Sequence, residues 1–318
     1  MPKVFSFVER EIRGLHEAAY LLGVFALFSA MLAIVRDRLL AGTFGAGEAL
    51  DIYYAAFRLP DIVFISIASL ASVFILVPIL SAKDNKEEQH ATIGNIVLAF
   101  SIVMIAGSVL LFLLLPFILP LLFPTLVVNG DLLVLSRILL LQPIFLGLSG
   151  IFASITQIHG RFMLYAVAPL LYNMGIIFGI VVLFPELGIL GVTLGVVLGA
   201  FLHLFIQVPF VIRQGFLTPY SFKLNLQELW QITATSIPRT ISVASNQIAL
   251  LVLVVVAASL SAGSVSVFNL ALNLQSAPLV IIGASYSVAA FPTLARFFSR
   301  GEHELFLGQI IAATRHVI

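Results

Sequence analysis

The chain has 318 residues, of which 61% are hydrophobic and 10% are charged, and its formal net charge is +1. Soluble globular chains carry about 25% charged residues, so this composition excludes an ordinary soluble domain and indicates a helical protein with many membrane spans. No basic tail is present, which argues against nucleic-acid binding. Without cysteine the chain has no disulfide, thiol nucleophile or cysteine metal site.

Apolar runs long enough to cross about 30 Å of hydrocarbon recur along the chain. They predict eight spans and, in LFLGQIIAATRHVI, the opening of a ninth. The first span is expected to end near Val35 and to be a retained helix rather than a cleaved signal peptide. Pro60 and Pro238 are expected to interrupt the second and seventh spans, and a tail with Pro116 and Pro120 follows the third. The eight spans are predicted at residues 18–35, 49–81, 91–115, 132–158, 162–184, 187–212, 230–260 and 265–290.

The distribution of Lys and Arg predicts the orientation. If the N-terminus is cytoplasmic, the outer loops hold only Arg36 and Arg38, in agreement with the positive-inside rule. The inner segments then hold Lys3, Arg10, Arg13, Lys83, Lys86, Arg161, Arg213, Lys223, Arg296 and Arg300. We therefore expect a multi-pass protein with a cytoplasmic N-terminus.

A weak internal repeat predicts the domain organisation. GAGEALDIYYAAFRLPDIV at 45–63 resembles SAGSVSVFNLALNLQSAPLVI at 261–281, and chance similarity between two apolar helices is the alternative. An even number of spans separates the copies, which indicates parallel repeats about an axis along the membrane normal. The predicted fold is an all-α polytopic one: a six-helix N-terminal lobe (1–212), a cytoplasmic amphipathic linker (213–228) and a partial C-terminal lobe (229–318) with the first two to three helices of a second repeat.

Ionisable side chains within spans are costly, so they are expected to face a cavity or a partner. Asp51 and Arg58 are seven residues apart and share a helix face, and Arg58 and Asp61 are close enough in sequence to pair directly. An ion pair that only orients helices is the alternative. Arg239, beside Pro238, either lines the cavity or is structural.

Amides add polar groups to the predicted cavity. The candidates are Asn173, Asn246, Gln247 and Asn273, whereas His203 is expected to hydrogen bond between helices. No enzyme motif, metal spacing or cofactor motif accompanies them. Because guanidinium groups bind phosphate through paired hydrogen bonds, the charges favour a transporter for an anionic molecule, and a phosphate-bearing or lipidic cargo is compatible with them.

The segment RDRLLAGTFGAGEALDIYYAAFRLPD at 36–61 resembles the signature of the MviN/MurJ lipid II flippases, within the multidrug/oligosaccharidyl-lipid/polysaccharide exporter superfamily. The similarity includes the Arg36-Asp37 pair that ends the first helix, the FGAG turn, and the triplet from Arg58 to Pro60. HGRFMLYAVAPLLYNMGII, SIPRTISVASNQIALLV and VAAFPTLAR continue it in order.

The resemblance implies two six-helix lobes around a central cavity, two further helices for the lipid tail, and inward and outward states. The chain reaches only the ninth of fourteen such helices. The cargo is then an undecaprenyl-diphosphate-linked sugar peptide, moved across the bacterial inner membrane. Arg36 and Arg58 would bind the diphosphate. Other arginines of the family are absent here, where the corresponding positions hold Ala30, Phe64, Ile65 and Asn273, and Arg38 and Arg239 are expected to replace them in part. The carboxylates expected to hold and release these arginines are Asp37, Asp51 and Asp61.

Two alternatives stay open. The same fold could carry another lipid-linked oligosaccharide or a small molecule, or it could be a non-transporting membrane scaffold. The expected partners are the polyprenyl-diphosphate-linked lipid, the bilayer and cell-wall synthesis proteins, with no nucleic acid, cofactor or metal, and no enzymatic activity.

Overall fold

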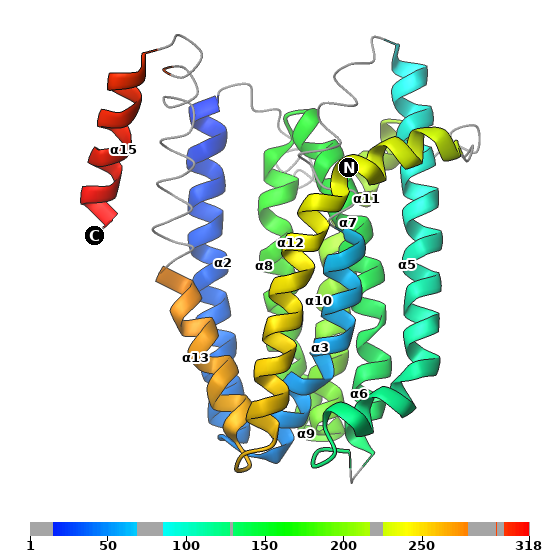
Figure 1. Ribbon diagram of the computed structural model, residues 1–318, viewed down its shortest axis with the longest axis vertical. Helices are drawn as coiled ribbons and strands as arrows, with labels where there is room; N and C mark the ends of the chain where they lie inside the picture. The colour runs from blue at the N-terminus through cyan, green and yellow to red at the C-terminus, as the bar shows by residue number, and fades with distance from the viewer. Residues whose placement is uncertain are drawn as a thin grey trace.

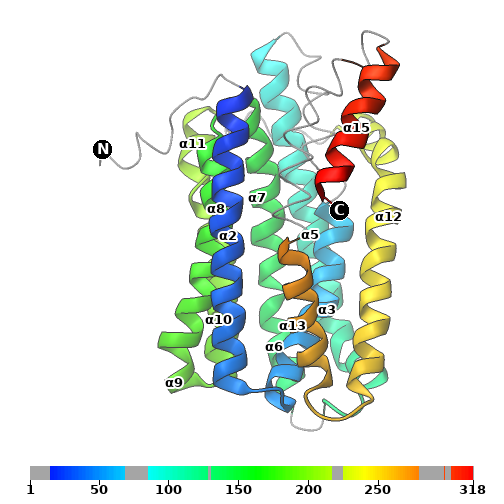
Figure 2. The same ribbon diagram turned by 90° about the vertical axis from the view of Figure 1, so that its left-hand side faces the viewer.

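The computed structural model describes residues 15–68, 85–127, 130–216, 225–278, 297 and 302–317; the side chains of some of these residues, Arg239 among them, lie outside the description. Within these residues every regular element is a helix, and most of the long helices run side by side in one bundle (Figures 1 and 2). The helices are α2 (Leu15–Phe44), α3 (Glu48–Ala68), α5 (Lys86–Leu122), α6 (Asp131–Leu139), α7 (Leu141–Ile158), α8 (Phe162–Phe178), the π-helical turn η2 (Gly179–Leu183), α9 (Phe184–Leu187), α10 (Ile189–Phe205), α11 (Val208–Arg213), α12 (Leu226–Ala258), α13 (Ser264–Pro278) and α15 (His303–Val317).

Six of the described helical segments are long and apolar enough to cross a membrane. They are 20–44, 87–122, 131–157, 162–187, 189–213 and 236–258, and they agree with six of the predicted spans. The second and eighth spans continue beyond α3 and α13 into residues outside the described ones. Apolar side chains on the outward faces of α2 and α5, including Val24, Met31, Val109 and Leu113, are exposed where lipid would cover them.

The Arg36-Asp37 pair does not end the first helix, so that prediction is wrong. The apolar run stops at Val35, but α2 continues to Phe44. Arg, Leu and Ala favour helix, and the two charges bind each other, as described below. The backbone therefore has no need to leave the helix where the hydropathy falls.

Other predicted boundaries and breaks also differ. α3 continues through Pro60 and α12 through Pro238, where interruptions were expected, and α5 continues through Pro116 and Pro120 to Leu122. Each proline removes one backbone hydrogen bond from the span. Neighbouring helices and local adjustments of the backbone satisfy the freed group, so the helix can continue. The predicted fourth span is instead two helices, α6 and α7, separated at Leu140.

The bundle has two ends, defined here by its turns. The turns at 45–47 and 259–263 lie at the lower end in Figure 1, and α5 and α12 begin at the upper end. The helices that open the two repeat copies, α3 and α13, both begin at the lower end (Figures 1 and 2). This is the common orientation that parallel repeats require.

α3 lies at the centre of the described structure. Its side chains from Leu50 to Ala56 are buried, and it packs against α5, α6 and α7 of the first lobe and α12 and α13 of the second. The helices of the second lobe therefore lie against the charged helix of the first.

Glycines allow α8 and α10 to pack backbone against backbone. A Cβ on Gly195 would lie 2.5 Å from Gly179 Cα and 2.8 Å from the carbonyl oxygen of Gly175. Glycines spaced four apart form a small-xxx-small interface: Gly175 of α8 and Gly179 at the start of η2 face glycines 191, 195 and 199 of α10. His203, one turn further on α10, bonds between helices as predicted, with its Nδ1 2.7 Å from Ser149 Oγ on α7.

Candidate functional site

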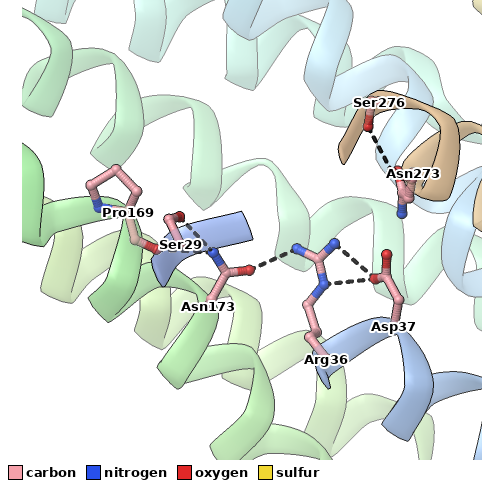
Figure 3. Close-up of polar contacts among 7 residues, drawn as sticks. All are labelled: Ser29, Arg36, Asp37, Pro169, Asn173, Asn273 and Ser276. Carbon is pink, nitrogen blue, oxygen red and sulfur yellow. Dashed lines mark hydrogen bonds and ion pairs between the residues drawn. The ribbon is translucent and has the colours of Figure 1, made fainter. Parts of the chain in front are cut away.

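Arg36 projects from α2 into a polar cluster between the lobes. Its Nε donates to Asp37 Oδ1 at 2.9 Å, and a second nitrogen lies 2.8 Å from the same oxygen. The remaining terminal nitrogen donates to Asn173 Oδ1 on α8 at 3.0 Å (Figure 3). The guanidinium is thus fixed by one charged and one neutral acceptor, while its side chain stays 17% exposed.

Asn173 is itself held in place by two acceptors. Its amide nitrogen donates to the carbonyl oxygen of Pro169 at 3.1 Å and to Ser29 Oγ at 3.4 Å. Because these bonds fix which atom faces Arg36, the amide oxygen is the one presented to the guanidinium (Figure 3).

The second lobe faces this cluster through α13. Figure 3 shows Asn273 of α13 pointing toward Asp37, and Ser276 donates to the carbonyl oxygen of Asn273 at 2.8 Å. Asn269 lies one turn before Asn273 and shares its helix face. The predicted site residues Arg36, Asp37, Asn173 and Asn273 are thus brought together by three helices that are distant in sequence.

Arg58 contacts α13 as well, although the expected partners differ from those observed. Its guanidinium donates to Asn269 Oδ1, and Asn269 in turn donates to the carbonyl oxygen of Val265 at 2.7 Å. Within the described residues, Arg58 forms no ion pair with Asp51 or Asp61, so the predicted direct pairing is wrong in this state. The neutral amide of the second lobe takes the place of the expected carboxylate.

Two donors on α3 are buried without a partner among the described residues. They are Arg58 Nε and the hydroxyl of Tyr54, one helical turn earlier. Tyr54 is 8% exposed and lies within electrostatic reach of Arg36, Asp37 and Arg58. Buried donors without acceptors are costly, which makes this stretch of α3 a place where an anionic ligand would be favoured.

Asp51 has a role that the sequence did not reveal. It caps α13: its carboxylate accepts from the backbone N–H of Gly263 at 2.6 Å, from the N–H of Ser266 at 2.7 Å and from the Ser266 hydroxyl. We call this set of contacts the Asp51 cap. A carboxylate at a helix N-terminus satisfies free amides and complements the helix dipole. Asp51 therefore joins the two lobes at the lower end rather than holding Arg58.

Beside the Asp51 cap, the two lower turns meet at backbone distance. Gly263 has φ +93°, and a Cβ there would overlap the carbonyl oxygen of Ala46. The FGAG and SAG turns of the two repeat copies therefore contact each other directly. Glycine at 263 is required both by the left-handed backbone and by the space.

Asp61 lies deeper in the span, against α7. Gln142 Nε2 donates to its Oδ1 at 3.4 Å. Gln142, which was not predicted as a site residue, is 4% exposed, and its Oε1 has no partner among the described residues. The apolar sequence around Gln142 is the signal that could have found it, since a lone amide in a span is unusual.

The other predicted residues fall elsewhere. Arg38 is exposed and lies two residues after Arg36, which places it on the opposite side of α2. Asn246 is exposed on α12, Gln247 is partly buried, and neither hydrogen bonds to this cluster in the described structure. The side chain of Arg239 lies outside the described ones. Tyr54 and Asn269 are the further members that sequence reasoning missed.

Together these features define a class: a multi-pass helical membrane protein with two lobes and a cationic polar site between them. Known structures share this fold. A solved structure described as lipid II flippase MurJ in an inward closed conformation superimposes with a TM-score of 0.77 at 22% identity, covering 94% of this chain and 62% of that one. An inward-facing multidrug resistance MATE family transporter of the MOP superfamily gives a TM-score of 0.66 at 18% identity, covering 96% and 67%.

The family follows from the sequence comparison. The profile of the family described as lipid II flippase MurJ matches residues 40–318. The chain therefore belongs to the lipid II flippase MurJ family. A probable lipid II flippase MurJ of Buchnera aphidicola subsp. Acyrthosiphon pisum is 28% identical over 86% of this chain and 56% of its own length. A lipid II flippase MurJ of Burkholderia cenocepacia is 26% identical over 86% and 55%. The chain thus spans about half the length of these relatives.

Proposed function

We propose that the protein is a lipid II flippase-like transporter of the bacterial inner membrane, not an enzyme, and that Arg36 and Arg58 bind the diphosphate of its polyprenyl-linked cargo. The observation that carries this proposal is the set of cationic and buried unpartnered donors on facing turns of α2 and α3. Arg36, Tyr54 and Arg58 present N–H and O–H groups, and phosphate oxygens are strong acceptors.

The site is placed where a cargo could be exchanged between the lobes. Arg36 lies eight residues before the end of α2, about 12 Å from the lower end by helix rise. Asn269 and Asn273 supply amides from the second lobe. A diphosphate would compete with Asn173 for Arg36 and with Asn269 for Arg58, because charge-assisted bonds to phosphate are stronger than bonds to a neutral amide.

The contacts at the lower end suggest how access would alternate. We take the lower end as the outer one, because Lys86, Arg161 and Arg213 lie in segments at the upper end. Outward opening would then break the Asp51 cap and separate Gly263 from Ala46. Once the contact opens, water at this end of the bundle could satisfy the freed groups. The N-terminus would be cytoplasmic, with cell-wall synthesis proteins as the expected partners.

The test measures binding of undecaprenyl diphosphate to the purified chain in lipid nanodiscs. Arg36→Ala is expected to weaken binding by about 10- to 100-fold, the equivalent of losing charged hydrogen bonds of about 1.5–3 kcal/mol. Arg38→Ala is the matched control: it removes an arginine two residues away on the opposite side of α2 and should bind as the wild type does.

A second arm distinguishes the alternatives. The gene that encodes the chain is expressed in a bacterium depleted of its own flippase, and growth is followed with the wild type and the Arg36→Ala variant. Rescue by the wild type alone supports the proposal. Equal rescue by both overturns the role of Arg36. Tight binding of an unphosphorylated small molecule, with no affinity for the diphosphate, would favour a different cargo, and no binding with no rescue would favour a scaffold.

A further inference from the structure

Between α3 and α7 lies a carboxylate that the proposed diphosphate site does not use. Asp61 lies 13 residues after the start of α3, about 20 Å along the helix from its lower end, whereas a hydrocarbon layer is about 30 Å thick. It is partly buried, and within the described residues it has no ion-pair partner within 4.0 Å. Its hydrogen bond from Gln142, at 3.4 Å, is long.

The cation nearest along the helix is engaged elsewhere. Arg58, one turn earlier on α3, attracts Asp61 electrostatically but donates its hydrogen bond to Asn269 of the second lobe. Tyr172 of α8 lies within electrostatic reach of both Asp61 and Arg36. A charged carboxylate at this depth is costly unless a positive charge compensates it.

Gln142 supplies an independent observation. It is 4% exposed, and its Oε1 is buried with no hydrogen-bond donor among the described residues. An acceptor left unsatisfied next to a carboxylate left unpaired is the pattern expected where a small cation binds. Carboxylate and amide oxygens are the ligands that hard cations prefer.

We propose that Asp61 and Gln142 form a binding site for a monovalent cation of the size of sodium. One carboxylate neutralises one positive charge, whereas a divalent ion would leave a net charge within the bilayer. Gln142 Nε2 lies 3.4 Å from Asp61 Oδ1, so an amide turned to place Oε1 at that position could share one ion with the carboxylate at about 2.4 Å from each oxygen, a distance ordinary for a cation of this radius. A flip of the Gln142 amide, which exchanges Nε2 and Oε1 and keeps the shape of the group, brings its free oxygen to Asp61.

The cation would also affect Arg58, and this step rests on the proposed function. With Asp61 neutralised, the Arg58 guanidinium is no longer attracted toward it and presents its full charge to a diphosphate. Binding of the cation and binding of the anion should therefore strengthen each other, and by linkage the factor is the same in both directions.

The test uses the full chain in nanodiscs made of uncharged lipid, with thermal unfolding followed in sodium chloride and in choline chloride. Sodium is expected to raise the midpoint of the wild type and of Asp131→Asn, a control that removes an exposed carboxylate at the start of α6. Asp61→Asn should abolish the rise, and Gln142→Leu should weaken sodium affinity by about tenfold or more, the equivalent of about 1.4 kcal/mol.

Each other outcome counts against the site. An equal sodium effect in Asp61→Asn places the ion elsewhere. Stabilisation by acid alone, with no sodium effect at any pH, overturns the sodium assignment in favour of a proton. Asparagine is nearly isosteric with aspartate and uncharged, so Asp61→Asn should fold; its far-UV circular dichroism verifies this before the comparison.

A last arm separates this inference from the proposed function. Affinity for undecaprenyl diphosphate is measured with and without sodium. Sodium-independent binding of the diphosphate overturns the coupling and leaves the proposed cargo intact. Sodium binding that depends on Asp61, without any diphosphate binding, supports the cation site and counts against the cargo.

Discussion

At the lower end of α3, the Asp51 carboxylate satisfies free amides of a helix that begins more than two hundred positions later. Its partners Gly263 and Ser266 lie 212 and 215 residues further along the chain. Asp51 is 2% exposed, so the charge is solvated by the end of α13 rather than by water. One residue thus stabilises both a helix terminus and the contact between lobes.

Asp51→Asn should loosen this contact. An amide has a single acceptor oxygen and no charge, so the variant keeps only part of the cap. The lost hydrogen bonding and the lost interaction with the helix dipole should together reduce the stability of the contact by about 0.5–2 kcal/mol. Spin labels at Thr43→Cys and Ser261→Cys, one on each side of the contact, should report a broader distance distribution by pulsed electron spin resonance. Asp131→Asn is the control, and an unchanged distribution in Asp51→Asn would contradict the assigned role.

The sequence identified most of the charged residues of the site but not their partners. Asn173 could be predicted because polar groups in a span need a cavity or a partner, whereas Arg36 and Asp37 followed from the resemblance to the family signature. The pairings of Asp51 with α13 and Arg58 with Asn269 could not, because helix spacing suggests local partners on α3. Tertiary packing supplied competing partners from the second lobe, and no local pattern encodes those.

At the scale of helices, the crossing of α8 and α10 depends on the absence of a Cβ atom in glycine. Lipid tails are as apolar as the side chains of a span, so helices in a membrane associate through close packing rather than through burial from water. The backbones of these two helices approach so closely that any Cβ at Gly195 would overlap the main chain of α8. This crossing fixes Asn173, and through it Arg36.

Gly195→Ala should therefore destabilise the first lobe by about 1–3 kcal/mol, the usual cost of overpacking. The matched control is Gly150→Ala in α7, where an added Cβ meets no atom within 4 Å and better helix propensity should stabilise by about 0.5–1 kcal/mol. Thermal unfolding in detergent compares the two. Equal stability of both variants would show that the crossing tolerates a methyl group.

The predicted helices follow the apolar runs because length and hydropathy suffice to define a span. Helix ends were less predictable, since hydropathy marks where lipid contact stops and not where helical hydrogen bonding stops. α2 passes through Arg36 and Asp37 for this reason, and α5 passes through its prolines. The glycine spacing on α8 and α10 is visible in the sequence and indicates close helix packing, but an interpretation based on polar groups does not include it.

Considered as a whole, the molecule has the Asp51 cap and three basic residues near helix ends at opposite ends of the bundle. The Asp51 cap lies at one end, and Lys86, Arg161 and Arg213 lie in segments at the other. The parallel arrangement of α3 and α13 was predictable from the repeat, because an even number of spans between two copies gives them one orientation. The sequence did not predict that α12 and α13 pack against α3, because this depends on which face of α3 the first lobe leaves uncovered.

The orientation can be tested directly because the chain contains no cysteine. Ser261→Cys, in the lower turn, should react with a membrane-impermeant maleimide added outside intact cells whose outer membrane is permeabilised. Gln214→Cys, after α11, should react only once the inner membrane is opened. Both residues are exposed. The opposite pattern would invert the assigned orientation and with it the outer position of the Asp51 cap.

Arg36 and Asp37 are consecutive residues of one helix, so their ion pair belongs entirely to the first lobe and moves with it. A single charge carried through 100 mV changes the free energy by about 2.3 kcal/mol, whereas a neutral pair that travels together contributes almost nothing. We infer that movement of these two residues is insensitive to the membrane voltage while the site is empty. Voltage sensitivity at this position would then arise only from what binds there.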